Sequence, residues 1–469
     1  MVFVSLEFLT LFLPAFLAVY AVTPPRARNA VLLTSSCIFY SWWSPIFLLL
    51  LLGVTFMAWL GGLMVERAAP GQRRKSLLAA LIVLNGATLC WFKYSNILVA
   101  TFNDLSPWLG MLPVEWERVV LPAGLSFFVL QSVSYLVDVY RGTVRAQPNF
   151  VAFAAYLSMF GHMIAGPIIR YDWIHSELHN RPFLWRNVSL GARRFMIGMS
   201  MKVLVADTLA PIADAAFALP HPSLADAWLG CAAYTLQLFF DFAGYSSMAI
   251  GLGLMVGFHF PENFNSPYLA RSIQDFWRRW HLSLSSWIRD YLYIPMGGNR
   301  LGVWKTYRNL LLTMAIAGLW HGGDSWNFLL WGIAHGAALS VARAWDRGGL
   351  PQLPVWLSRL LTILFVMLAW TLFRAVGFDA ALAMYRGQFG LNGIAPGDAM
   401  TLVLRPTHLL AAALGVAWVM LPLAQPWLSQ RASGLALRCW HAAWPLAGFL
   451  LSFGLVAARG SVPFLYFQF

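Results

Sequence analysis

Charged residues are scarce in this sequence. Asp, Glu, Lys and Arg make up only 11% of its 469 residues, whereas 59% of the residues are hydrophobic. Soluble domains average about 25% charged residues, so this chain has too little polar surface to cover a soluble globule of its size. Apolar runs of about 18 residues recur, and they lack the alternating pattern of an outer-membrane barrel. The composition therefore predicts an all-α integral membrane protein.

Paired cysteines and a cleavable leader are also missing. The four cysteines, Cys37, Cys90, Cys231 and Cys439, are scattered and form no CxxC motif. This spacing supports neither a disulfide framework nor a zinc site, and no metal centre is expected. The first 22 residues contain no basic segment and no small-residue cleavage site, so they are expected to remain as the first span.

Acidic residues are fewer than basic ones. The sequence has 19 Asp and Glu against 32 Lys and Arg, which gives a formal net charge of +13. In a soluble protein this excess could indicate nucleic-acid binding. In a membrane protein it indicates basic cytoplasmic loops that face anionic lipids. Membrane lipids are therefore expected partners, and nucleic acid is not.

The positions of the basic residues predict the topology. Counting apolar runs between basic loops gives roughly ten to twelve crossings in one membrane domain over residues 1–469. The sequence SWWSP at 41–45 is expected to break one long apolar stretch into a hairpin, because proline disrupts a helix. Residues 151–169 fit a re-entrant segment and a plain span equally well. The aromatic tail at 461–469 is expected at a membrane interface.

Residues 271–323 concentrate Arg, Trp and His in an otherwise apolar chain. Read as one helix, residues 272–292 place an aromatic and aliphatic stripe on one side, with His281 at its edge. His281 could then face a cavity while Arg278 and Arg279 face water or phosphate. Tyr293, with the proline and glycines after it, is expected to end this helix in a turn.

Basic side chains are dense in the same region. Seven of them lie between positions 271 and 308, opposed only by Asp275 and Asp290. They would attract an anionic, phosphate-bearing donor such as coenzyme A. Ordinary anchoring of a cytoplasmic face by positive charge is an equally good interpretation for most of them.

His321 is expected deep in the membrane. The apolar run that begins at Leu310 brings it roughly 18 Å into a core about 30 Å thick. A histidine at that depth needs a partner or a water-filled path. Gly318, Gly322 and Gly323 are expected to leave room for a substrate beside it. A lone histidine in an apolar run is more often a packing residue, but these glycines, Trp320 and the depth favour a function.

An acid within a predicted span is a second intramembrane polar group. Asp241 lies in LFFDFAGYSS, and a carboxylate at this depth is a functional hypothesis by default. The alternative is a packing residue satisfied by Tyr245, Ser246 or a basic residue of a neighbouring helix. Both interpretations stay open from the sequence.

Two motifs together resemble those of a known family. WRRWHLSLSSWIRDYLYIPMGGNR at 277–300, followed by GLWHGG at 318–323, resembles the signature of membrane-bound O-acyltransferases, in particular their bacterial alginate O-acetyltransferase branch. The opening MVFVSLEFLTLFLPAF, residues 239–268 and the closing FLYFQF match that branch as well. The resemblance therefore extends from one end of the chain to the other.

The resemblance implies a ring of helices around a central tunnel. It designates His321 as the catalytic residue and His281 as its polar partner. Histidine suits this chemistry, because acyl transfer from a thioester to a hydroxyl needs a base near neutral pH. The further candidates for substrate binding are Trp277, Arg278, Arg279, Trp280, Arg289, Tyr293, Trp320 and Asp241.

The same resemblance implies the reaction partners. A cytoplasmic donor, expected to be acetyl-CoA, would supply an acetyl group at the bacterial inner membrane, and no tightly bound cofactor is expected. A periplasmic acetyltransferase or acyl-carrier partner would then modify an exopolysaccharide such as alginate or bacterial cellulose. The alternatives are a D-alanyl or peptidoglycan O-acyltransferase, a transporter of an activated acyl group or lipid-linked sugar, and a scaffold whose partner is the catalyst.

Overall fold

The computed structural model describes residues 1–164, 166–431 and 434–465, and these residues form helices and no strands. Seven helical segments in this part of the chain are long and apolar enough to cross a membrane. The prediction of an all-α integral membrane protein is confirmed. Roughly ten to twelve crossings were expected from run lengths, and the smaller number arises because several apolar runs form shorter or more polar helices. The seven segments are Pro45–Arg67, Gln72–Leu109, Trp185–Ala218, Leu224–Met255, Val355–Arg374, Pro406–Ala424 and Ala442–Arg459.

The helices divide into two compact units. The first unit comprises residues 1–195 and 246–261. Its α-helices are α1 (Leu13–Val22), α2 (Arg28–Ser41), α3 (Pro45–Arg67), α4 (Gln72–Leu105), α5 (Leu125–Arg141), α6 (Phe150–Leu157), α7 (Phe160–Met163), α8 (Tyr171–His179), the first part of α9 (Trp185–Ser200) and the last part of α11 (Leu224–Met255).

The second unit comprises residues 196–245 and 262–468 and contains both histidine motifs. Its helices include α10 (Asp207–Ala218), most of α11 (Leu224–Met255), α12 (Ile273–Trp277), α13 (Leu282–Ile288), α14 (Val303–His321), α15 (Asn327–Arg347), α16 (Val355–Arg374), α17 (Phe378–Gln388), α18 (Asp398–Val403), α19 (Pro406–Arg431) and α20 (Gly434–Arg459). The prediction of a single domain stays a prediction.

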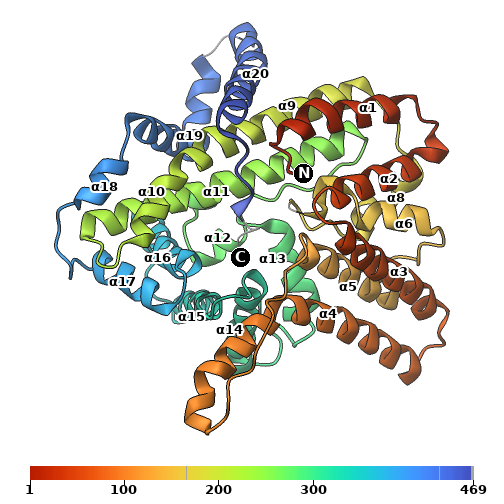
Figure 1. Cartoon of the computed structure of the whole chain (residues 1–469), viewed down its shortest axis with the longest axis horizontal. Coiled ribbons are helices and arrows are strands. Elements are labelled where there is room, and N and C mark those ends of the chain that lie inside the picture. The colour runs from red at the N-terminus through yellow and green to blue at the C-terminus, as the bar shows by residue number, and fades with distance from the viewer. Residues whose placement is uncertain (165, 432–433, 466–469) are drawn as a thin grey trace. The chain divides into compact units, whose positions relative to one another are not determined.

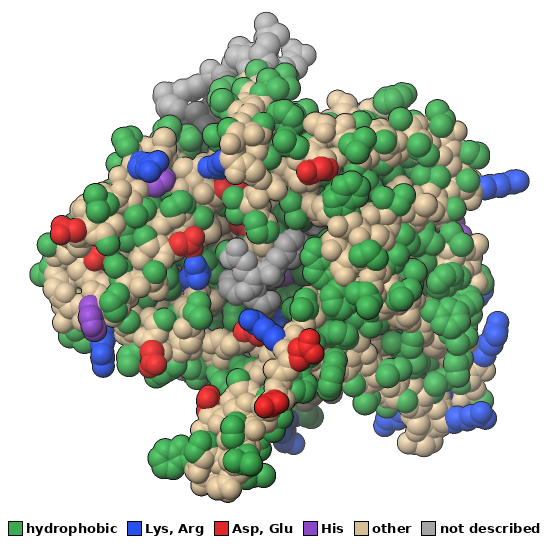
Figure 2. All heavy atoms as spheres, viewed as in Figure 1, with side chains coloured by type: hydrophobic (Ala, Val, Ile, Leu, Met, Phe, Trp, Pro, Cys, Tyr) green, Lys and Arg blue, Asp and Glu red, His purple; other side chains and the backbone are tan. Residues whose placement is uncertain are grey.

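Hydrophobic side chains cover much of the surface. Figure 2 shows them spread over the face in view, with Lys, Arg, Asp and Glu sparse between them. Large apolar side chains such as Val22 and Leu402 are more than four-fifths exposed. Such a surface is unfavourable in water and suits contact with lipid. The surface thus agrees with the composition.

Two breaks in the apolar sequence follow from local chemistry. Helix α2 ends at Ser41 and α3 begins at Pro45, which is the predicted hairpin break. Proline is favoured at a first helical position because its missing N–H would be unpaired there. Helices α6 and α7 span only 8 and 4 residues, so neither can cross a core about 30 Å thick. A plain span over 151–169 is therefore excluded.

Helices α14 and α15 lie side by side, and glycines bring them close (Figure 1). A Cβ on Gly318 would lie 2.2 Å from the Phe328 carbonyl oxygen, and one on Gly332 would lie 2.2 Å from that of Met314. A Cβ on Gly322 would overlap the Phe328 ring at 2.0 Å. The expectation that Gly318 and Gly322 leave room for a substrate is therefore wrong, because helix packing fills that space.

Candidate active site

The segment around His281 is not one helix. Helix α12 (Ile273–Trp277) ends before it, α13 (Leu282–Ile288) begins after it, and a π-helical turn (Arg289–Tyr293) follows. His281 itself has a left-handed backbone, with φ 44° and ψ 57°. Residues other than Gly, Asn and Asp rarely adopt this conformation. The prediction of a continuous helix over 272–292 is wrong, and so is the position it gave His281 on the aromatic stripe.

Asn263 supplies the physical reason for this break. Its carbonyl oxygen accepts a hydrogen bond from the Leu282 N–H at 2.9 Å. Its side-chain Oδ1 accepts from the Ser283 N–H at 3.2 Å and from the Ser283 hydroxyl at 2.9 Å. His281 Nδ1 lies 3.2 Å from the same oxygen. These bonds give the Leu282 and Ser283 N–H groups at the start of α13 acceptors outside the helix.

The His281 ring is completely buried. It lies perpendicular to the Phe242 ring of α11, with 4.6 Å between centroids, and 6.4 Å from Trp320. Its Nε2 has no hydrogen-bond partner within the described residues. The ring is therefore held by a hydrogen-bond contact at Nδ1, while Nε2 has none within the described residues.

His321 is the last residue of α14, at the end of the apolar run, and its predicted depth in the membrane stays a prediction. The side chain is only 4% exposed. Its ring lies edge to face with Trp331 at 5.2 Å and with Phe373 at 5.3 Å. The adjacent Trp320 ring is 4.9 Å away. Because His281 contacts the same indole, the structure brings the two predicted catalytic residues to one buried aromatic cluster.

A third buried histidine was not predicted. His335 of α15 is completely buried, and its Nδ1 accepts a hydrogen bond from Trp277 Nε1 at 3.3 Å. Its ring lies 4.7 Å from Trp331, which also contacts His321. The signal in the sequence is WGIAHG, a histidine between glycines in an apolar run, like the motif around His321.

The predicted tryptophans belong to this packing. Trp280 is buried and stacks on Phe276 at 5.5 Å, and it lies 5.1 Å from Trp370. The indole N–H of Trp277 donates its hydrogen bond to His335. Rings of this size dominate the packing energy of a core. Both side chains fix the histidine cluster, and contact with a substrate stays a prediction.

The predicted donor-binding arginines have different surroundings. Arg279 Nε is 2.8 Å from Asp275 Oδ1, and Arg289 Nε is 2.7 Å from Asp290 Oδ1. Arg278 is exposed. Although partial burial of Asp275 acts in the opposite direction, Arg279 and the Arg271 N–H hold the pKa of this carboxyl below its ordinary value. Arg278 is thus the guanidinium best available to an anion, while Arg279 and Arg289 have carboxylate partners.

Tyr293 closes the π-helical turn and is half-buried. Burial raises the pKa of its hydroxyl, so the group stays protonated near neutral pH. The side chain can therefore donate a hydrogen bond, and its predicted contact with a substrate is untested.

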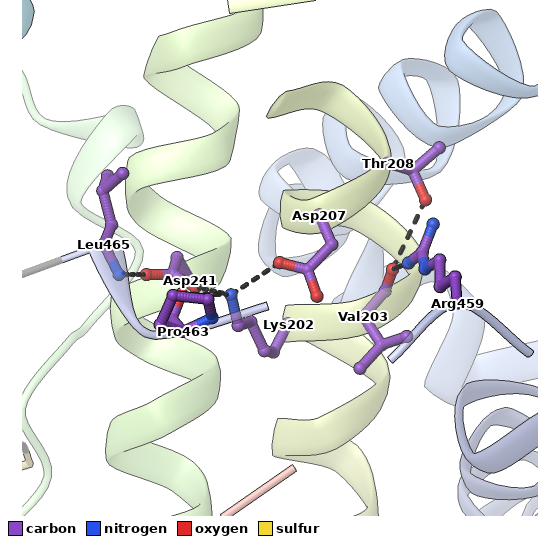
Figure 3. A network of polar contacts seen from close by, with 8 residues as sticks. All are labelled: Lys202, Val203, Asp207, Thr208, Asp241, Arg459, Pro463 and Leu465. Carbon is purple, nitrogen blue, oxygen red and sulfur yellow. Dashed lines mark hydrogen bonds and ion pairs between the residues drawn. The ribbon is translucent and has the colours of Figure 1, made fainter. Parts of the chain in front are cut away.

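Asp241 lies in a buried ionic network with Lys202, which Figure 3 shows. Lys202 Nζ is 2.6 Å from Asp241 Oδ1 and 2.5 Å from Asp207 Oδ1. All three side chains are at least nine-tenths buried. A basic residue of a neighbouring helix therefore satisfies Asp241, as one of the two interpretations proposed. Lys202 was not predicted as a functional or structural residue, although a lysine within a predicted span indicates one.

The C-terminal segment completes this network (Figure 3). The Leu465 N–H donates to Asp241 Oδ2 at 2.8 Å, and Lys202 Nζ donates to the Pro463 carbonyl at 3.3 Å. Phe464 is fully buried and packs 5.7 Å from Phe242. The expectation that this tail lies at a membrane interface stays a prediction for its described part, and residues 466–469 lie outside the described residues.

The geometry favours acid–base chemistry by the protein's own side chains. Within the described residues, no group of three or more His, Cys, Asp and Glu is placed to hold a metal ion. The buried histidines contact aromatic rings, an amide and a hydroxyl. Such a site can hold neutral imidazoles close to a substrate in a medium of low polarity.

Comparisons with known proteins agree with the motifs. The sequence model of the MBOAT, membrane-bound O-acyltransferase family matches residues 80–373, which include His281, His321 and Asp241. The probable alginate O-acetylase AlgI of Azotobacter vinelandii is 47% identical over 396 residues, covering 84% of this chain and 79% of the relative. The protein of that name in Pseudomonas aeruginosa is 46% identical, covering 84% and 75%. A peptidoglycan O-acetyltransferase of Helicobacter pylori is 36% identical, covering 84% and 81%.

Proposed function

Because the chain belongs to the membrane-bound O-acyltransferase family, we propose that this multi-pass membrane enzyme O-acetylates a polysaccharide of the cell envelope. The proposed donor is acetyl-CoA on the cytoplasmic side of the bacterial inner membrane. The proposed final acceptor is alginate or a chemically similar exopolysaccharide such as cellulose. The single observation that supports this chemistry best is the pair His281 and His321 against one buried indole, Trp320.

The proposed reaction moves an acetyl group from sulfur to oxygen. The hydroxyl oxygen attacks the thioester carbonyl, the new C–O bond forms and the C–S bond breaks. His321 takes the hydroxyl proton and returns it to the departing thiolate, so the products are an ester and coenzyme A thiol.

The donor would approach from the basic surface near α12 and α13. Arg278 is exposed there and suits contact with a phosphate of coenzyme A. In the cell, a periplasmic acetyltransferase or acyl-carrier protein would carry the acetyl group onward to the polymer. In the purified system, an oligosaccharide hydroxyl takes the place of the partner's hydroxyl as the direct acceptor. Acetyl transfer by an enzyme does not require two compartments separated by a membrane, whereas transport does. Transfer by protein in detergent therefore distinguishes an enzyme from a transporter.

The experiment is transfer by the purified full chain in detergent. Labelled acetyl-CoA and alginate oligosaccharides are supplied, and ester formation and thiol release are measured. We expect wild-type transfer and a roughly 10²–10⁴-fold loss in His321→Ala, the range for removing a general base. Cells carrying His321→Ala should make polymer without O-acetyl groups. Normal polymer acetylation by a fully inserted His321→Ala protein would overturn the role of His321.

A further inference from the structure

The amide of Asn263 determines which nitrogen of His281 carries the hydrogen. The Ser283 backbone N–H can only donate, and it points at the Asn263 side-chain atom 3.2 Å away. That atom must therefore be the amide oxygen, since an NH₂ group there would place a second donor against the Ser283 N–H. His281 Nδ1 faces this oxygen at 3.2 Å, so Nδ1 carries the hydrogen and donates it.

The opposite nitrogen is then a bare acceptor. A neutral imidazole has one N–H, so His281 Nε2 holds a lone pair. Among the described residues, the ring contacts Phe242 from α11, Trp320 from α14, and Asn263 with Ser283, and none of these carries a charge. Nε2 is buried and has no hydrogen-bond partner in the described part of the chain. A buried acceptor left without a donor is unfavourable by about 1–3 kcal/mol, so a ligand that donates a hydrogen is its natural complement.

A second buried histidine, His335, has the opposite tautomer. There the Trp277 indole N–H, which can only donate, points at Nδ1 at 3.3 Å. The neutral His335 ring must therefore carry its hydrogen on Nε2, the opposite tautomer to that of His281. The second unit thus holds two buried histidines in opposite tautomers. Asn263 determines the tautomer of His281, and Trp277 determines that of His335.

We propose that Asn263 is a positioning residue that holds His281 in the tautomer whose Nε2 accepts a hydrogen bond from a bound substrate. The proposal rests on the proposed function. It excludes one role for the neutral ring, because Nε2 has no hydrogen with which to polarise a thioester carbonyl. The group that it binds is a hydroxyl of the acceptor or an amide N–H of the donor, and the two share the chemistry of a hydrogen-bond donor.

The test uses three variants of the full chain in the acetyl-CoA and alginate oligosaccharide assay. Asn263→Ala removes the fixing oxygen and should lower kcat/KM roughly 10–100-fold, as loss of an orienting neighbour does. Asn263→Asp keeps an oxygen and adds a charge that favours imidazolium. It should retain more activity than Asn263→Ala, and the acid limb of its kcat/KM profile should move to higher pH. Ser283→Ala leaves the Asn263 to His281 contact in place and should lose less than Asn263→Ala.

The outcomes separate the possibilities. A rise in KM for the oligosaccharide assigns Nε2 to the acceptor hydroxyl, and a rise in KM for acetyl-CoA assigns it to the donor amide. An Asn263→Asp profile that coincides with wild type, or a loss in Ser283→Ala equal to that in Asn263→Ala, would overturn the proposal. Absence of transfer by the wild-type chain would instead count against the proposed function.

Discussion

Two buried polar clusters of the second unit differ in how their groups are paired. In the first, Lys202 lies between two carboxylates at 2.5 and 2.6 Å, and the tail adds backbone contacts. In the second, the contacts of His281 end at an Nε2 without a partner in the described residues. A buried charge without a partner is strongly destabilising, whereas a buried neutral acceptor without a partner costs much less. The Lys202 cluster is therefore expected to stabilise the folded protein, and the His281 cluster to take part in the reaction.

Removing the central charge of the Lys202 cluster should have the largest effect. Lys202→Met leaves Asp207 and Asp241 as buried carboxylates without their cation, which should destabilise the folded protein by about 3–5 kcal/mol. Thermal unfolding in detergent would measure this loss, with activity expressed per folded molecule. The matched control is the triple variant Lys202→Met, Asp207→Asn and Asp241→Asn, which removes all three charges and should recover much of the stability. Equal instability of the two variants would show that packing, not charge pairing, matters here.

Removing the His281 imidazole should lower activity and leave stability unchanged, the opposite of the effect at Lys202. Asparagine tolerates the left-handed backbone of position 281, so His281→Asn should fold with an unchanged unfolding temperature. It should lose roughly 10–100-fold in kcat/KM because the imidazole acceptor is gone. Unfolding and kinetics on the same preparation would check both halves. A lower unfolding temperature with full activity per folded molecule would reverse the assignment of the two clusters.

The ion pair beside the site should have the smallest effect. The lowered pKa of Asp275 means that its contribution is present above the ordinary aspartate pKa and is lost as pH falls through the lowered value. Asp275→Asn should destabilise the protein by less than about 1 kcal/mol at neutral pH, the usual range for an ion pair that solvent can reach. The difference from wild type should begin to shrink as pH falls below about 4, the ordinary aspartate pKa, and vanish only below the lowered pKa of Asp275. Unfolding temperatures of both proteins from about pH 2 to 7 would measure it, and a difference that does not shrink as pH falls would contradict the ion-pair origin.

Much of the architecture could be predicted because membrane insertion constrains the sequence strongly. Apolar run length gave the helical class, and proline at position 45 gave the hairpin break between α2 and α3. The run after Leu310 also gave the position of His321 at the end of a helix. These features depend on neighbours along the chain, so a single sequence contains them.

The details of the site depend on contacts between residues far apart in the chain, and such contacts could not be predicted from the sequence. Nothing in WHLS signals a left-handed backbone at His281, since its cause is Asn263, 18 positions earlier. The glycines around His321 suggested room for a ligand, but the partner helix α15 occupies it. Lys202 and Asp241 are far apart in the chain, and only the fold shows that they neutralise one another.

The attachment of the tail has a consequence for biosynthesis. Leu465 follows Asp241 by 224 positions, so at about 5–20 residues per second the ribosome needs roughly 11–45 s to supply it. During that interval Asp241 has entered the membrane without the backbone donor that the finished protein provides. We expect an inserted but incomplete chain to expose an unfinished polar pocket, by which quality-control proteases could distinguish it from the completed enzyme.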